Sequence, residues 1–217
     1  MIDSATFIKT LNATDCNTTN AHAIGLSFPQ KYNEVMFPSI SNNDEYHFNA
    51  TDVETGVVVP LRRILRPTNN QQHITGFTDY IRTKGLQCGD VLCLEKRTNF
   101  SDSATKTQYY LDVVKRENIL ILQKNKNGFI ILRNDIGTDY FESSHDVLFQ
   151  GQAKTLNIAF SKSDKRQHNS STIDDFYGIT LDNEDVRVFI KHSFIEIDTI
   201  TNIIRGIDDV QFVIINQ

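Results

Sequence analysis

The sequence has no tryptophan and only three cysteines, Cys16, Cys88 and Cys93. An odd number of cysteines without a Cys-x-x-Cys pair indicates neither a disulfide framework nor a zinc site. No apolar run approaches membrane-spanning length, and the N-terminus lacks the charged, apolar and small-residue order of a secretory signal. We therefore expect a protein of the reducing cytoplasm that has no membrane partner.

Recognisable catalytic motifs are also missing. No Asp or Glu has Lys two positions later, as the common metal-dependent nuclease core requires, and no histidine begins the His-x-Lys motif of phospholipase-type nucleases. A nucleophile elbow, a phosphate loop and a Rossmann glycine pattern are absent too. The carboxylate pairs Asp174-Asp175 and Asp208-Asp209 would face opposite ways in a strand, which favours solvated turns over metal sites. We expect no catalytic residue, no metal site and no cofactor, and the sequence leaves open whether the chain is an enzyme.

The chain is long enough for one large β domain or two small domains, because it has 217 residues of which 39% are hydrophobic, including 14 Phe. Its formal net charge is −5. Residues 1–118 hold 12 Lys and Arg against 13 Asp and Glu, whereas residues 119–217 hold 10 against 14. Any positive surface must therefore be local, and the first half is the better place for it.

Negative charge is locally absent between Glu54 and Asp79. This interval contains a basic, amide-rich run made of Arg62, Arg63, Arg66, Asn69, Asn70, Gln71, Gln72 and His73. Guanidinium groups can pair with guanine and carboxamides with adenine, so the run predicts a polyanion partner, double-stranded DNA above all. The simpler interpretation is an ordinary solvated loop.

Short apolar segments with frequent turns predict a mainly β protein with short helices, of the α+β class. Phe77, Tyr80 and Ile81 have the spacing of one helix face, and Gly85 stands where a left-handed cap would end that helix. The Asn127-Gly128 pair between apolar runs predicts a hairpin. We also expect a strand over residues 186–191, a helix over residues 199–205 and a closing strand over residues 210–215. No internal repeat is visible.

Residues 5–115 resemble the plant-type B-three DNA-binding pseudobarrel, a fold shared with EcoRII-type effector-binding and BfiI-type target-recognition domains of restriction endonucleases. Three elements carry the resemblance, in order: Phe7-Ile-Lys-Thr-Leu-Asn-Ala-Thr-Asp15, Leu26-Ser-Phe-Pro-Gln-Lys31, and Thr75-Gly-Phe-Thr-Asp-Tyr-Ile81 with Lys84-Gly-Leu-Gln-Cys-Gly-Asp-Val91. The last block is similar to the family's Gly-Trp-x-x-Phe-Val and Lys-Gly-Leu-x-x-Gly-Asp-x-Val pattern. Phe77 replaces the Trp and Tyr80 replaces the Phe.

The resemblance implies that two loop arms grip the major groove of DNA. By position, the first arm falls on residues 17–25 and the second on residues 62–73. The first arm is neutral here, whereas the family often carries basic charge in it. The implied DNA-binding residues are Asn17, Thr18, Thr19, Asn20, His22, Lys31, Arg62, Arg63, Arg66, Asn69, Asn70, Gln71, Gln72 and His73.

Several of these residues have structural alternatives. His22 could form hydrogen bonds within a loop instead of reading a base, and His73 could stabilise the end of its loop. Because Arg62 and Arg63 are adjacent at a strand end, they face opposite ways, and only one is expected to reach DNA. Pro67 stiffens the segment that presents Arg66.

The sequence therefore predicts a seven- or eight-stranded DNA-binding pseudobarrel over residues 1–118 and a smaller β-rich module of unknown role over residues 119–217. The expected function is sequence-specific binding of double-stranded DNA, as the target- or effector-recognition part of a restriction endonuclease that has a separate nuclease domain or subunit. One alternative is an intact restriction nuclease with an atypical active site in residues 119–217. The other is a barrel that binds protein and not DNA.

Overall fold

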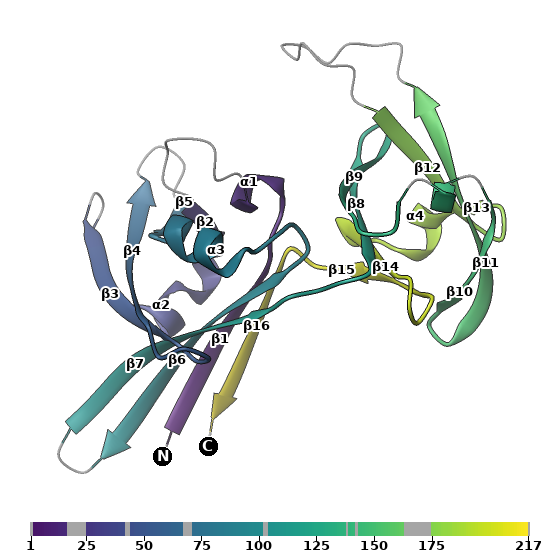
Figure 1. The fold of residues 1–217 in the computed structure, drawn as a ribbon. Coiled ribbons are helices and arrows are strands. Elements are labelled where there is room, and N and C mark those ends of the chain that lie inside the picture. The colour runs from purple at the N-terminus through teal and green to yellow at the C-terminus, as the bar shows by residue number, and fades with distance from the viewer. Residues whose placement is uncertain are drawn as a thin grey trace. The chain divides into compact units, whose positions relative to one another are not determined.

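β-Strands make up most of the chain in the computed structural model, which describes residues 2–16, 25–41, 44–66, 71–101, 104–137, 139–141, 143–162 and 175–216 (Figure 1). The mainly β fold class expected from the sequence is confirmed. The chain divides into two compact units, Met1–Lys115 with Val210–Gln217, and Arg116–Asp209. No described helix is long and apolar enough to cross a membrane.

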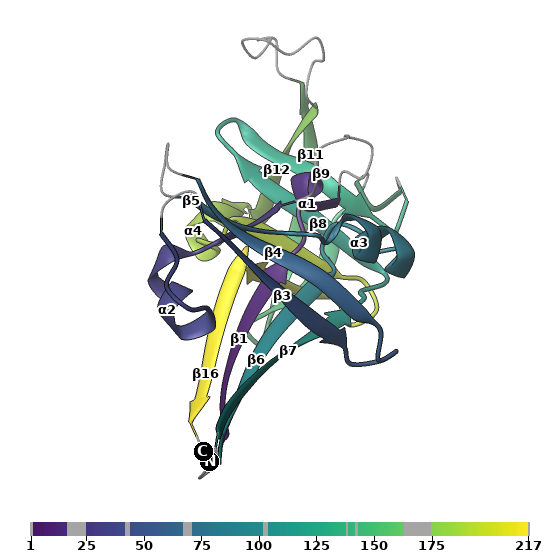
Figure 2. The same cartoon turned by 90° about the vertical axis from the view of Figure 1, so that its left-hand side faces the viewer.

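The first unit contains an eight-stranded sheet in the order β16-β1-β6-β7-β3-β4-β5-β2. Neighbouring strands are antiparallel except β3 and β7, which run parallel. Figure 2 shows β16, β1, β6 and β7 side by side. The elements are β1 Ile2–Thr10, α1 Ala13–Cys16, β2 Gly25–Phe28, η1 Gln30–Tyr32, α2 Asn33–Met36, β3 Glu45–Asp52, β4 Val58–Arg66, β5 Gln71–Thr75, α3 Thr78–Lys84, β6 Val91–Ser101, β7 Ala104–Val114 and β16 Val210–Asn216.

Aromatic side chains fill the core of the first unit. Phe37, which follows α2, is buried and packs against Phe28, Phe48 and Tyr109, with ring centroids 5.2 to 5.8 Å away. Phe28, Phe48 and Tyr109 belong to β2, β3 and β7, and each points to the core face of the sheet. The core thus holds distant parts of the sheet in register.

Helix α3 ends as the sequence predicts. Gly85 adopts the left-handed conformation with a φ of 63°, and its N–H donates to the carbonyls of Arg82 and Ile81. Glycine adopts this conformation without the steric cost of a Cβ. The helix buries Tyr80 and Ile81, the apolar face that the sequence pattern indicates.

A buried carboxylate joins α3 to the β3–β4 turn. Asp52 accepts hydrogen bonds from the Tyr80 hydroxyl at 2.5 Å, from Lys84 Nζ at 3.1 Å and from the backbone and hydroxyl of Thr55 at 2.6 Å. Burial by itself would raise the pKa of Asp52, but these donors outweigh it and hold the pKa well below its usual range. Lys84 also reaches Glu54 in the turn, at 2.7 Å.

The second unit contains a sheet of eight strands in the order β11-β10-β15-β14-β8-β9-β12-β13, and an additional β11–β12 pairing closes it into a barrel. Buried Leu, Ile and Val side chains, such as Leu120, Leu156, Ile179 and Ile197, fill the barrel. The elements are β8 Ile119–Asn125, β9 Gly128–Asn134, η2 Asp139–Phe141, β10 His145–Phe149, β11 Gln152–Lys162, β12 Asp175–Leu181, β13 Glu184–Asp185, α4 Val186–Phe189, β14 Phe194–Asp198 and β15 Ile203–Ile207.

Three local expectations differ from the structure. The last strand, expected in the C-terminal module, pairs with β1 over seven residue pairs and so lies in the first unit. Residues 186–189 form α4 and not a strand, and Asp185 caps it by accepting from the backbone N–H of Arg187. The expected helix over residues 199–205 is a turn followed by β15, with Asp198 accepting from the N–H groups of Ile200 and Thr201.

The basic run is mostly strand, although the sequence predicts a loop there. β4 continues through Arg62 and Arg63 to Arg66, and β5 begins at Gln71. Residues 67–70 therefore separate β4 from β5 in the sequence. The register pairs Arg66 with Gln71 and Arg62 with Thr75. Most of the predicted second arm therefore belongs to the sheet.

Candidate nucleic-acid interface

One face of the β2-β5-β4-β3 part of the sheet points away from the aromatic core. Register places Gly25, Thr75, Arg62 and His47 in one row across these four strands. Directly opposed residues share a face, so the row projects on one side. We call this surface the Arg62 face. It consists of Gly25, Ser27, Glu45, His47, Asn49, Arg62, Ile64, His73 and Thr75.

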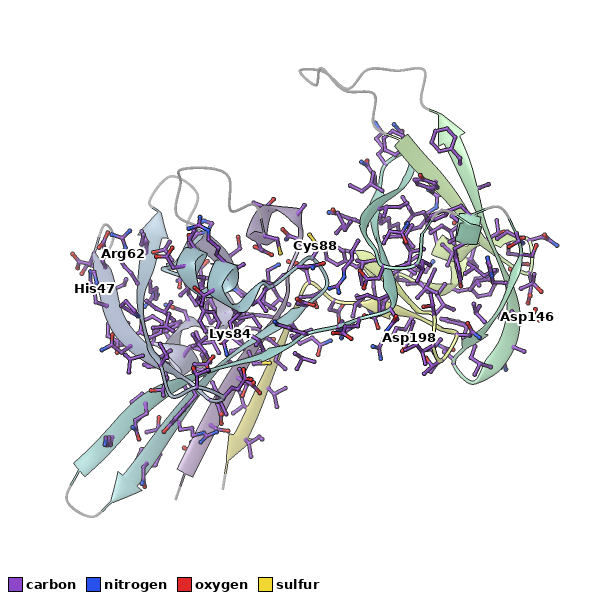
Figure 3. All side chains as sticks on the ribbon, viewed as in Figure 1. His47, Arg62, Lys84, Cys88, Asp146 and Asp198 are labelled. Carbon is purple, nitrogen blue, oxygen red and sulfur yellow. The ribbon has the colours of Figure 1, made fainter. Side chains whose placement is uncertain are left out.

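Arg62 lies at the centre of a polar network on this face. Its Nη1 lies 3.2 Å from both carboxylate oxygens of Glu45, and its Nε donates to Thr75 Oγ1 at 3.4 Å. His47 Nε2 lies 3.2 Å from Glu45 Oε2. Figure 3 labels Arg62 and His47 on this part of the first unit. The guanidinium is held along the sheet, and Glu45 bridges it to the imidazole.

The network is held loosely enough to exchange partners. The side chain of Arg62 is 41% exposed and that of Glu45 is 38% exposed. An ion pair at this exposure contributes only about 0–1 kcal/mol, because water screens it. A phosphate or a base edge can therefore replace Glu45 at little cost, while the Thr75 hydroxyl still orients the guanidinium.

A shallow hollow of about 270 Å³ lies beside Arg62, lined by His47, Pro60, Leu61, Arg62, Thr75 and Gly76. Gly76 shapes it, because its φ of 104° is unfavourable for other residues and a Cβ would lie 2.5 Å from the Pro60 carbonyl oxygen. The backbone after β5 therefore passes close to β4, and only glycine permits this approach. Both polar side chains (His47, Arg62 and Thr75) and apolar ones (Pro60 and Leu61) line the hollow.

Arg63 faces the other way and belongs to the core. Its side chain is buried, with Nε donating to Gln72 Oε1 at 3.1 Å and Nη1 donating to the Pro38 carbonyl at 2.8 Å. The guanidinium also lies over the Phe37 ring, 5.5 Å from its centroid. Burial lowers the pKa of Arg63, yet an arginine stays charged. We therefore remove Arg63 and Gln72, which is also buried, from the predicted DNA-binding residues.

The last residue of the first predicted arm, Gly25, belongs to the Arg62 row. Before it, α1 is fixed by a buried ion pair between Lys9 Nζ and Asp15 at 3.0 Å, and Asn12 Oδ1 accepts from the N–H groups of Thr14 and Asp15. After it, Gly25 begins β2 as the register partner of Thr75. The described residues on either side of positions 17–24 thus belong to α1 and β2, and Gly25 lies on the Arg62 face.

The structure describes some of the other predicted DNA-binding residues and not the rest. Lys31 is exposed on η1, with its Nζ 4.7 Å from the Tyr32 ring centroid, and His73 is half-buried in β5 opposite Ser27 and Ile64. The backbones of Arg66 and Gln71 pair at the end of β4 and β5. Asn17, Thr18, Thr19, Asn20, His22, Asn69 and Asn70 lie outside the described residues.

The sequence interpretation missed the contribution of β3. Glu45, His47 and Asn49 occupy alternate positions of this strand and are exposed, whereas Phe48 and Ala50 between and after them are buried. This period-two alternation of polar and apolar residues was visible in the sequence and could have identified the polar face. Among the described residues, no group of three or more His, Cys, Asp and Glu is placed to hold a metal ion.

The fold and this face define a β pseudobarrel with a polar, partly cationic sheet surface. No family model and no curated protein matches the chain. Among solved structures, it is similar to an Arabidopsis FUS3–DNA complex, with 19% identity and a TM-score of 0.39 over 51% of this chain and 96% of that one.

It is also similar to the B3 domain of the UbaLAI restriction endonuclease with cognate DNA, with 16% identity and a TM-score of 0.38 over 52% of this chain and 69% of that one. These likenesses concern the fold.

Proposed function

We propose that the first unit binds double-stranded DNA in a sequence-specific manner, through the Arg62 face and the two connections that adjoin it. The observation that carries the proposal is the row of Gly25, Thr75, Arg62 and His47, which presents an exchangeable guanidinium on a rigid sheet. Arg62 would contact a phosphate or the O6 and N7 atoms of guanine. His47, Asn49 and Ser27 would donate to neighbouring acceptors.

Two arms in the major groove remain the expected mode of binding. Base edges would be read by the carboxamides of Asn69, Asn70 and Gln71 and by residues 17–22. Arg66 would reach the DNA backbone or a guanine. The neutral first arm limits phosphate contacts, so we expect modest affinity with a sequence preference carried by amides. Within a restriction endonuclease, such a unit would select the target or effector site for a nuclease domain or subunit.

The test is selection of bound duplexes from a randomised pool, followed by fluorescence anisotropy on the enriched sequence. Arg62→Ala should weaken binding about 5- to 100-fold, equivalent to about 1–3 kcal/mol, and relax the preference at one base pair if Arg62 reads a base. If Arg62 contacts a phosphate, the affinity for every sequence should fall by the same factor. The slope of log affinity against log salt concentration should then become shallower by about one.

Arg97→Ala is the matched control. Arg97 lies on β6, is 47% exposed and pairs with Glu95 at 2.7 Å, so it resembles Arg62 in exposure and pairing but not in position. Its replacement should leave the affinity unchanged. If no sequence is enriched and no duplex binds at low salt, the proposal is wrong. If the affinity depends neither on salt nor on Arg62, the face is better explained as a surface for protein partners.

A further inference from the structure

The two units share one order of strands. We number the strands of each unit by their order along the chain and leave out β16 and the two-residue β13. In the sheet of the first unit, neighbouring strands then follow the order 1-6-7-3-4-5-2, which is β1-β6-β7-β3-β4-β5-β2. The barrel of the second unit has the same order, which is β8-β14-β15-β10-β11-β12-β9. Figure 1 allows both paths to be followed.

Strand directions agree as well. In each unit, neighbouring strands are antiparallel except the third and the seventh, which are parallel: β3 with β7, and β10 with β15. Short helices also lie at the same places along the chain. Between the second and third strands, the first unit has η1 and α2 and the second unit has η2. Between the fifth and sixth strands, the first unit has α3 and the second unit has α4. The second unit therefore repeats the connectivity of the first.

The positions of the two predicted arms have counterparts in the second unit. The first arm joins the first and second strands, and there the second unit has the β8–β9 turn at residues 125–128. The second arm joins the fourth and fifth strands, which in the second unit are β11 and β12. That connection, residues 163–174, lies outside the described residues and forms no part of the site considered below.

The β8–β9 turn has the composition of a nucleic-acid contact. Lys124, Lys126 and Asn127 are exposed on it. Asn125 Oδ1 accepts from the backbone N–H of Lys126 at 2.5 Å, and a Cβ on Gly128 would lie 2.8 Å from the Tyr177 carbonyl oxygen. The turn is therefore fixed closely against β12, and its two ammonium groups project from a rigid support.

We propose that the second unit is a second DNA-binding module, which contacts phosphates of double-stranded DNA through Lys124, Lys126 and Asn127 of the β8–β9 turn. This proposal rests on the proposed function of the first unit. The unit as a whole is acidic, but the nearby carboxylate of Asp185 is already bound by Arg187, with Nε to Oδ1 at 2.9 Å. With only two lysines the module is weak by itself, so its binding is expected at low salt, where phosphate contacts contribute most.

The test uses the full chain with two copies of the selected duplex, one carrying a donor dye and the other an acceptor dye, at low salt. Energy transfer should appear when one protein holds both duplexes, and sedimentation should give a complex of one chain with two duplexes. Lys124→Glu/Lys126→Glu should abolish the transfer and leave anisotropy binding of one duplex unchanged. Lys191→Glu, an exposed lysine after α4, is the control and should keep the transfer.

The outcomes separate the two proposals. A wild-type chain that binds one duplex but never two, or a double variant that still bridges two, overturns the second module and leaves the first intact. Transfer from complexes that contain two chains also overturns it. A wild-type chain that binds no duplex at all contradicts the function proposed for the first unit. Thermal melting of the double variant should match the wild type, because the two lysines are exposed.

Discussion

Glu45 and Arg62 are diagonal neighbours across the β3–β4 pair, and the guanidinium Nη1 lies equally far, at 3.2 Å, from both carboxylate oxygens. The carboxylate occupies the place where a phosphate or a guanine edge would bind Arg62. It also repels any phosphate that approaches His47, its other neighbour. In the proposed binding mode, Glu45 would therefore restrain non-specific binding by the Arg62 face.

Glu45→Gln should therefore increase the affinity for random duplex DNA by about 2- to 5-fold at low salt, equivalent to about 0.5–1 kcal/mol. The gain should shrink as salt is added, because exposed charges are screened. Anisotropy across a salt series measures it. Glu95→Gln, which frees Arg97 on β6, provides the comparison and should change nothing. A Glu45 variant that binds more weakly than the wild type would mean that Glu45 accepts from DNA, for example from a cytosine amino group.

Replacement of Arg63 should damage stability and not recognition. Arg63→Leu leaves the buried Gln72 amide and the Pro38 carbonyl without their donor, so we expect a loss of about 2–4 kcal/mol in the free energy of unfolding. Arg62→Leu, one position away on the other face, should change that free energy by less than about 0.5 kcal/mol. Urea denaturation measures both. Equal effects of the two changes would show that the faces are wrongly assigned.

The bond between Tyr80 and Asp52 predicts a pH dependence at both extremes. Because the folded pKa of Asp52 is depressed, its stabilisation is complete above the unfolded value of about 3.9 and is lost as pH falls through the folded pKa. Burial and Asp52 raise the pKa of Tyr80, so its contribution is complete below about pH 10 and is lost as pH rises towards the folded pKa.

Tyr80→Phe should cost about 1.5–3 kcal/mol at neutral pH, because a hydrogen bond to a charged group is lost. The difference from the wild type should shrink below about pH 4 and above about pH 10. Urea titrations at several pH values measure it. Tyr110→Phe on β7 is the control, since Tyr110 lies under Arg97 and outside this network. A cost that stays constant with pH would show that Tyr80 contributes packing alone.

Two glycines with positive φ should respond differently to alanine. At Gly76 a Cβ meets the Pro60 carbonyl oxygen at 2.5 Å, whereas at Gly56, with a φ of 72°, nothing lies within 4 Å. Gly56→Ala should cost about 1–2 kcal/mol for the left-handed backbone alone. Gly76→Ala should cost about 2 kcal/mol more, because β4 must move. Denaturation of both variants checks the difference, and equal costs would argue against the close approach.

Local patterns explain which expectations were confirmed. Phe77, Tyr80, Ile81 and Gly85 define α3 because a helix needs only near neighbours and a cap. The β8–β9 hairpin lies where Asn127-Gly128 predicts one, although its two loop residues are Lys126 and Asn127 and Gly128 is the first residue of β9. The four-residue α4 was misread, because an apolar stretch that short fits a strand as well as a helix, and the cap by Asp185 decided it.

The sequence by itself determined the mainly β class, α3 with its cap, and the absence of familiar catalytic motifs, since each depends on residues close together in the chain. Tertiary structure alone decided that Arg63 is buried while Arg62 is exposed, that Glu45 and His47 join Arg62, that β16 completes the first unit, and that the second unit repeats its connectivity. These features depend on strand pairing between distant residues, and pairing is set by packing of the whole sheet, which period-two patterns do not specify.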